Sequence, residues 1–227
     1  MNPETLHAEC RDALAAHADP IRAAGARAYL KTEQAMFGVP RPVQKRLLRE
    51  VFARHPATER EPWEAAARLL WGGPERELQY AAIAWLSVGR RRFLTLDTVP
   101  LLEQLAREGA WWDLVDEIAA HAVGAVVARH REQMRPVLLR WIDDPSLWVR
   151  RTALLAQLTH RADTDVELLF DLCLRQAPDR SFWIRKAIGW ALRQHARTDP
   201  GAVRAFLDQH GAALSGLSRR EAAKHLG

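Results

Sequence analysis

An acid, a guanidinium and a primary amine recur at one spacing: Asp116, Arg151 and Lys186 follow one another at intervals of 35 residues. A tryptophan precedes each of them by three or four positions, and an apolar run of Ala, Ile and Leu follows. A period of this size is typical of a helical solenoid, in which equivalent residues of stacked units line one surface. We therefore expect the three groups in a row with indoles close by. That combination suits a partner that is both anionic and aromatic, such as nucleic acid.

Trp112 and Asp116 lie four residues apart, as do Lys186 and Trp190, so each pair shares one face of a helix. Residue type alone favours simpler roles: a solvated acid or an ion-pair partner at Asp116, and core packing for Trp190. Cations at the positions equivalent to Asp116, and indoles on both sides of the row, favour a functional carboxylate. Trp111 points about a hundred degrees away from Trp112 on a helix and is expected to serve the core.

The elements that must position these groups are helices. Apolar residues recur at three- and four-residue spacing, and prolines punctuate the pattern where new helices begin. Strand patterns are nearly absent, and we expect about twelve helices joined by short loops. The later helices are expected to pair as 75–88 with 97–108, 112–129 with 132–143, 145–160 with 164–176, and 180–197 with 199–210.

No long linker or low-complexity tract divides the chain, so we expect one all-α domain over residues 1–227. The period predicts its architecture, a helical-repeat solenoid. Near the C-terminus, the spacing of Ser218 and Glu221 predicts a capping box before a last short helix. Four tryptophans in apolar stripes are expected to be structural: Trp63, Trp71, Trp85 and Trp141.

Composition fits a protein that handles a polyanion. The formal net charge is +5, and only four of the 33 basic residues are lysines. Guanidinium forks suit phosphate oxygens better than ammonium groups do, although a codon bias toward arginine gives the same excess.

Cys10 and Cys173 form neither a disulfide framework nor a metal spacing, which favours a reducing, cytoplasmic setting. The N-terminus does not resemble a signal peptide, and no run approaches the ~18 apolar residues of a membrane span.

Other kinds of chemistry lack their sequence signatures. The nine histidines show neither an HExxH pattern nor paired-ligand spacing, so we expect no metal. No Gly-rich phosphate loop occurs, and we expect no cofactor. Lys186 offers a Schiff-base nucleophile for a lyase. Beside Arg151, however, it is better suited to contact a phosphate.

Longer blocks of the sequence resemble the AlkD family of bacterial DNA glycosylases. The blocks are WWDLVD at residues 111–116, WVRR at 148–151 and KAIGWALR at 186–193. The WWDxVD and KAIGW patterns are specific, and both occur in the order expected for that family. Shorter blocks at 28–31, 37–40, 74–79 and 217–222 agree as well. The resemblance runs from near residue 20 to the C-terminus and so covers almost the whole chain.

The resemblance implies a HEAT-like solenoid of antiparallel helix pairs whose concave groove holds double-stranded DNA. It implies a monomeric enzyme that hydrolyses the N-glycosidic bond of purines alkylated at N3 or N7 without flipping the base. Asp116 matches the family's catalytic acid, which would stabilise an oxocarbenium-like transition state or position water. Arg151 matches the active-site arginine, and together with Lys186 it would favour the ionised form of Asp116. Trp112 and Trp190 match the indoles that flank the deoxyribose of the lesion.

The resemblance also assigns contacts to DNA. Tyr29 matches an N-terminal aromatic residue that reaches the duplex, and Lys45 and Arg193 match contacts to the backbone. Two departures from the family occur. In the loop that precedes Pro42, Arg41 is expected to replace polar DNA contacts, and Thr159 stands where a lysine is expected.

Two alternatives to a glycosylase belong to other classes. The first is a HEAT-type DNA-binding or scaffold protein without catalysis, and the second is a solenoid that binds protein. Salt dependence separates the second from the DNA-binding hypotheses, because phosphate contacts make affinity fall steeply with salt. The sequence does not indicate whether N3-methyladenine, N7-methylguanine or a bulkier adduct is preferred.

Overall fold

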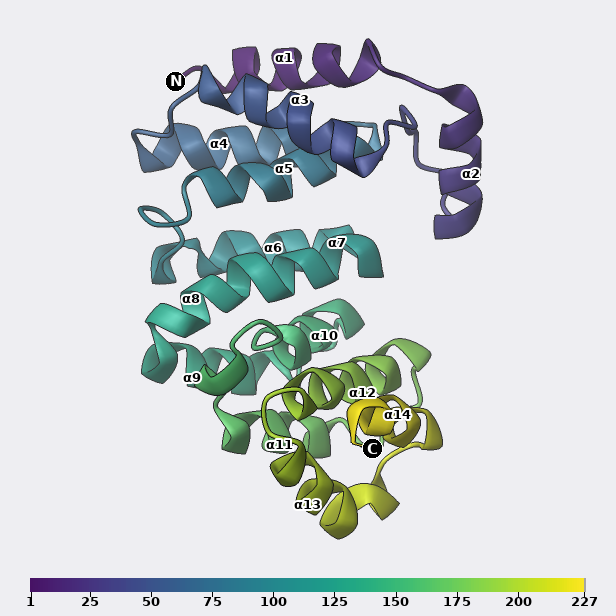
Figure 1. Ribbon diagram of the computed structural model, residues 1–227. Helices are drawn as coiled ribbons and strands as arrows, with labels where there is room; N and C mark the ends of the chain where they lie inside the picture. Colours follow the sequence, from purple (N-terminus) through teal and green to yellow (C-terminus); the bar gives the residue numbers. More distant parts are fainter. Residues whose placement is uncertain (227) are drawn as a thin grey trace. The chain divides into compact units, whose positions relative to one another are not determined.

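The computed structural model describes residues 1–226, and these form helices joined by short loops (Figure 1). The chain divides into two compact units, of which unit 1 is Met1–Phe93 and unit 2 begins at Leu94. Unit 1 contains α1 (Pro3–Ala15), α2 (Pro20–Leu30), α3 (Arg41–Ala53), α4 (Arg60–Trp71) and α5 (Arg76–Val88). Within residues 1–226 the extended backbone pairs only at an isolated bridge between Ala35 and Glu75, so the prediction of an all-α fold is confirmed.

Unit 2 contains the remaining helices, again with short connections. In chain order they are η1 (Leu96–Thr98), α6 (Val99–Gly109), α7 (Trp112–Glu117), η2 (Ile118–Val123), α8 (Gly124–Arg129), α9 (Arg131–Trp141), α10 (Leu147–Leu155), η3 (Arg161–Asp163), α11 (Val166–Arg175), α12 (Phe182–Ala196), α13 (Pro200–His210), η4 (Gly211–Ala213), α14 (Gly216–Ala222) and η5 (Ala223–His225). The expected single domain over residues 1–227 remains a prediction, and Gly227 lies outside the described residues.

Helix starts follow the proline and capping signals. Prolines occupy the first turn of α1, α2, α3, α6 and α13, where a missing N–H costs nothing. The capping box predicted at Ser218 and Glu221 is wrong, because α14 starts earlier. Ser215 is its N-cap and accepts a hydrogen bond from the Ser218 N–H at 3.0 Å, which leaves Glu221 in the last turn.

The long helix expected over 112–129 is confirmed, since α7, η2 and α8 follow one another without a break. The expected pairing of 75–88 with 97–108 spans the two units and stays a prediction. In unit 1, α5 packs against α4, and in unit 2, α6 packs against α7 and η2. The sequence pattern predicted the helices, but a stripe of apolar residues does not say which neighbour covers it. The other three expected pairs are in contact as α8 with α9, α10 with α11, and α12 with α13.

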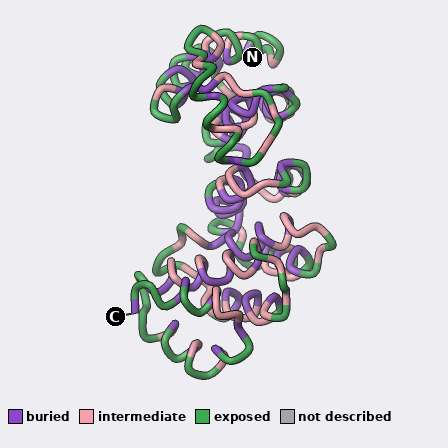
Figure 2. The backbone as a smooth tube through the Cα atoms, turned by 90° about the vertical axis from the view of Figure 1, so that its right-hand side faces the viewer, coloured by how far each residue is buried: buried purple, intermediate pink, exposed green. Residues whose placement is uncertain are grey.

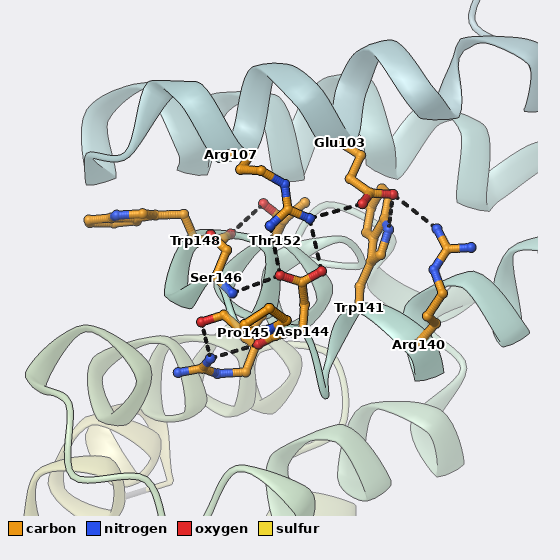
Figure 3. Close-up of polar contacts among 10 residues, drawn as sticks. Glu103, Arg107, Arg140, Trp141, Asp144, Pro145, Ser146, Trp148 and Thr152 are labelled. Atoms are coloured by element: carbon orange, nitrogen blue, oxygen red, sulfur yellow. Dashed lines mark hydrogen bonds and ion pairs between the residues drawn. The ribbon is translucent and has the colours of Figure 1, made fainter.

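The 35-residue period is visible in the loops of unit 2. The Asp144 carboxylate accepts from the Ser146 N–H at 2.7 Å, and 35 residues later Asp179 accepts from the Ser181 N–H at 2.6 Å. Arg107 donates to both oxygens of Asp144 at 2.9 Å, which ties α6 to the loop before α10 (Figure 3). Equivalent polar contacts at equivalent positions define a repeated structural unit.

Tryptophans fill the cores as expected. In unit 1, the Trp85 indole donates to the Trp63 carbonyl at 3.0 Å and Trp63 donates to the Trp85 carbonyl at 3.4 Å, so both buried N–H groups are satisfied. Trp71 is 6% exposed, and in unit 2 Trp141 is 1% exposed and donates to Glu103 at 2.7 Å. Buried positions recur along the helices (Figure 2), and none of the helices in residues 1–226 is long and apolar enough to cross a membrane.

Candidate active site

Asp116 and Arg151 form a buried ion pair between α7 and α10. Arg151 donates from Nε to Oδ1 at 2.6 Å and from Nη2 to Oδ2 at 2.8 Å, which is the parallel geometry of a bidentate guanidinium–carboxylate pair. Only 8% of Asp116 and 2% of Arg151 is exposed. Two of the three residues that repeat every 35 positions are therefore in direct contact. The proposed acid and its arginine lie where the sequence pattern predicts.

Arg151 also reaches a third helix. Its Nη1 donates to the carbonyl of Trp183 in α12, and its Cζ lies 5.9 Å from the centre of the Trp183 ring. Nearly all of the guanidinium is thus used inside the protein. Arg151 is placed to orient the Asp116 carboxylate rather than to bind a phosphate from solvent.

The charge state of Asp116 reflects two opposing effects. Burial raises the pKa of the Asp116 carboxyl, and the hydrogen bonds from Arg151 lower it only in part. The nearby charges of Asp113 and Glu117 raise the pKa further. Arg151 thus favours the ionised form of Asp116 as expected, whereas Lys186 does not contribute, because it pairs with Glu221. Both oxygens nevertheless face N–H donors, which is the geometry of an ionised carboxylate.

The helix changes its winding immediately after Asp116. The segment η2 is a π-helix, which loosens the backbone and leaves carbonyls short of their usual partners. Thr159 donates its hydroxyl to the Ala120 carbonyl at 3.2 Å, and His160 Nε2 lies 2.9 Å from the Gly124 carbonyl. Thr159, which departs from the expected lysine, therefore supports the π-helix. Sequence patterns gave no sign of this segment.

Trp112 and Trp190 are only partly buried, unlike the core tryptophans. Trp112 begins α7 one turn before Asp116, and Trp190 lies on α12 one turn after Lys186. Partial exposure disfavours the simple core-packing alternative for Trp190. Both rings retain surface for contact with a ligand.

Three further tryptophans form a cluster that the sequence interpretation missed. Trp111, Trp148 and Trp183 stand at the starts of α7, α10 and α12, and their ring centres lie 6.0, 5.2 and 5.7 Å apart. Trp111 was expected to serve the core, but it is partly exposed and packs on the other two indoles. The available signal was the tryptophan that opens each repeated block. Through Trp183 this cluster contacts Arg151.

Lys186 and Arg193 meet at Glu221. Lys186 Nζ lies 2.7 Å from Glu221 Oε1, and Arg193 Nη1 lies 2.8 Å from Oε2. Lys186 therefore does not join the Asp116–Arg151 pair as the 35-residue row suggested. The expected contacts of Lys186 and Arg193 with DNA remain predictions.

The other predicted DNA-binding residues belong to unit 1. Tyr29 on α2 is 73% exposed, and Lys45 lies on the exposed face of α3. The Arg41 guanidinium lies 4.1 Å from the centre of the Tyr80 ring, a cation–π distance. Its Nη1 also donates to Gln44 at 3.4 Å, so Arg41 is partly engaged within the unit. Among residues 1–226, the His, Cys, Asp and Glu side chains form no cluster suited to a metal ion.

Comparison with known proteins places these features in a family. The model of the family described as "DNA alkylation repair enzyme" matches residues 10–226. A solved structure described as a predicted DNA alkylation repair enzyme from Enterococcus faecalis superposes with a TM-score of 0.85 at 29% identity, covering 93% of this chain and 97% of that chain. No curated protein matches the sequence.

Proposed function

Because the chain belongs to the family of DNA alkylation repair enzymes, we propose that it is a monofunctional DNA glycosylase. Its substrates are purines made cationic by alkylation at N3 or N7 in double-stranded DNA. The reaction hydrolyses the N-glycosidic bond and leaves an abasic site with the strand intact. No metal or cofactor takes part in this scheme.

The observation that carries the proposal is the buried Asp116 carboxylate, held at both oxygens by Arg151. Departure of a cationic purine leaves positive charge on the deoxyribose, as an oxocarbenium-like transition state. A fixed carboxylate in a largely water-excluded site stabilises such charge more strongly than one in water. The same carboxylate can instead position the attacking water, since its remaining lone pairs point away from the guanidinium.

In this proposal the partly exposed indoles of Trp112 and Trp190 flank the deoxyribose of the lesion. The face of an indole attracts a cation, and it therefore favours the charged sugar over a neutral one. An alkylated purine is already a good leaving group, so much of the selectivity comes from the lesion itself. For this reason the proposal does not require the base to be flipped out of the duplex.

The alternative is a DNA-binding or scaffold protein without catalysis. A surface that only binds DNA has to offer its cations to phosphate, whereas all three nitrogens of the Arg151 guanidinium donate within the protein. Asp116 in its pair with Arg151 therefore favours the glycosylase over this alternative.

Release of free base from methylated duplex DNA tests the proposal. We expect release by the wild type with strand cleavage only after alkali, and a loss of about 100-fold or more in Asp116→Asn, comparable to removing a main stabiliser of transition-state charge. Asp171→Asn is the control, since it removes a partly exposed acid that pairs with Arg175 on its own helix, and it should keep wild-type activity. Full activity in Asp116→Asn would refute the catalytic role. No release by the wild type, with salt-sensitive DNA binding retained, would favour the non-catalytic alternative.

A further inference from the structure

Four positions follow the 35-residue period, because Glu221 lies 35 residues after Lys186. They form two ion pairs: Asp116 with Arg151, which joins α7 to α10, and Lys186 with Glu221, which joins α12 to α14. The order of charges is reversed between the pairs. The last pair is therefore the repeat equivalent of the candidate active site, with the acid supplied by the C-terminal helix.

Glu221 collects three cations. Its Oε1 accepts from Lys186 Nζ at 2.7 Å and from Lys224 Nζ at 2.8 Å, and its Oε2 accepts from Arg193 at 2.8 Å. The Glu221 side chain is 7% exposed, whereas the side chains of its partners are 35%, 49% and 23% exposed. The carboxylate is thus hidden and the cations remain accessible to a ligand.

The KAIGWALR block explains how α14 approaches so closely. Lys186, Gly189 and Arg193 lie on one face of α12, and a Cβ at Gly189 would stand 2.5 Å from the Cβ of Glu221. A side chain larger than hydrogen would therefore push α14 away. The Ser218 hydroxyl fixes the contact further by donating to the Arg185 carbonyl at 2.8 Å.

Asp116 and Glu221, the two acids at equivalent positions of the repeat, lie in surroundings of opposite net charge. Asp116 has one cationic partner, and the charges of Asp113 and Glu117 act on it as well. Glu221 has three cationic partners, so its cluster carries an excess of two positive charges. A glycosylase acting on DNA needs both environments: a negative one for the sugar cation and a positive one for the backbone phosphates.

We propose that Glu221 and the three cations form a phosphate clamp for the DNA backbone, in which Glu221 is a positioning residue and Lys224 is a further phosphate contact. The inference rests on the proposed action on DNA and extends its binding surface to the end of the chain. Without the buried carboxylate the three cations repel one another and their flexible side chains spread. With it, they converge on one anion.

Binding of an undamaged duplex over a range of KCl concentrations tests the role of Lys224. We expect Lys224→Ala to weaken affinity several-fold and to reduce the slope of log K against log salt by about 0.9, as for one lost phosphate contact. Arg140→Ala is the matched control, because Arg140 is also exposed and also paired with a single acid, Glu103. A Lys224→Ala variant that binds like the wild type, with an unchanged slope, would overturn the clamp.

Glu221→Gln separates positioning from simple electrostatics. Removing a negative charge should tighten DNA binding if the cations act alone, whereas loss of their organiser should weaken it. We expect weaker binding in spite of the added positive charge, with recovery in Glu221→Asp. Tighter binding by Glu221→Gln would reject the positioning role.

Two further measurements distinguish the clamp from a site for free phosphate and from the glycosylase activity. Inorganic phosphate at constant ionic strength should compete only weakly, since one free ion lacks the linked contacts of a duplex. Tight phosphate binding that Lys224→Ala abolishes, with DNA affinity unchanged, would contradict a backbone site. Base release by the wild type is measured separately, so a glycosylase without a clamp and a clamp without a glycosylase give different results.

Discussion

Arg151 is the residue through which the candidate site is held together. One guanidinium binds Asp116 at both oxygens, donates to the Trp183 carbonyl and lies beside the Trp183 ring. A lysine in its place has no planar fork and could not satisfy these partners at once. The arginine therefore has two effects on Asp116: it fixes the direction of the carboxylate, and it opposes the rise in pKa that burial causes.

Replacing Arg151 with Gln should move the pH dependence of base release. Burial raises the pKa of Asp116 and Arg151 lowers it in part, so loss of the positive charge raises this pKa further. In the proposed reaction Asp116 acts as a carboxylate, so activity should be lost as the pH falls through its pKa. We therefore expect the acid limb of the pH–rate profile, measured in single turnovers, to move to higher pH.

Arg150→Gln is the control for this shift. Arg150 is the preceding residue of α10, but it binds Asp179 and Gln176 instead of Asp116. Its substitution should leave the acid limb where the wild type has it. An unmoved limb in Arg151→Gln, in protein whose circular dichroism matches the wild type, would show that another group sets the profile.

At the scale of elements, the continuous rod α7–η2–α8 links Asp116 to the turn that follows α10. Asp116 lies just before the π-helix, whose Ala120 carbonyl and the adjoining Gly124 carbonyl are satisfied by Thr159 and His160. Gly124 makes this approach possible, since a Cβ there would stand 2.7 Å from the Ala156 carbonyl oxygen. The position of Asp116 therefore depends on packing that lies two turns away along the same rod.

Gly124→Ala should destabilise the protein and reduce base release. The added methyl group meets backbone, which cannot rotate away, and such overpacking typically costs about 1–3 kcal/mol. Gly25→Ala is the control, because a Cβ at that position of α2 has no neighbour within 4 Å. It should be neutral or stabilising, by up to about 1 kcal/mol. Thermal unfolding and base release measure both effects, and equal behaviour of the two variants would disprove the role given to the close contact.

Sequence alone predicted much at this scale, and the failures have physical causes. Apolar spacing and prolines predicted the helices, and the period placed Asp116 opposite Arg151. The sequence did not predict the π-helix η2, because no residue type is specific to a π-helix. The partner of Lys186 was missed for a simpler reason: the period continues to Glu221, but the last helix was interpreted through a capping pattern instead. The cluster of Trp111, Trp148 and Trp183 depends on ring directions that spacing does not determine.

Across unit 2, many arginines form ion pairs that connect neighbouring repeats. Ion pairs join successive helices and loops, including Arg107 with Asp144, Arg140 with Glu103, Arg135 with Asp165, Arg150 with Asp179 and Arg175 with Asp143. The excess of arginine over lysine therefore has a structural explanation besides phosphate binding and codon bias. Single exposed pairs of this kind contribute little to stability, about 0–1 kcal/mol each. Their value lies in fixing the register of neighbouring repeats.

Acid should lower the stability of the protein over two ranges of pH. Burial lowers the pKa of His160 and His195, so the unfolded chain binds their protons first and stability falls as the pH drops below about 6.5. Burial would raise the pKa of Glu221, but hydrogen bonds from Lys186 and Lys224 outweigh it and hold the value at about 2. The stability that Glu221 contributes is therefore present above its ordinary value of 4.5 and is lost as the pH falls from there toward about 2.

Thermal unfolding of the wild type and Glu221→Gln at a series of pH values measures this contribution. We expect the variant to melt lower at neutral pH. The difference in melting temperature should shrink below about pH 4.5, because the unfolded wild-type chain then gains a proton on Glu221 that the folded protein takes up only near pH 2. Glu167→Gln should show a small difference that does not change with pH, because the Glu167 side chain is 86% exposed and lies 3.4 Å from Arg135. A difference for Glu221→Gln that stays constant down to pH 2 would mean that its carboxylate is not the charged centre of the α12–α14 contact. In that case the packing of Gly189 and Ser218 alone would hold the end of the chain.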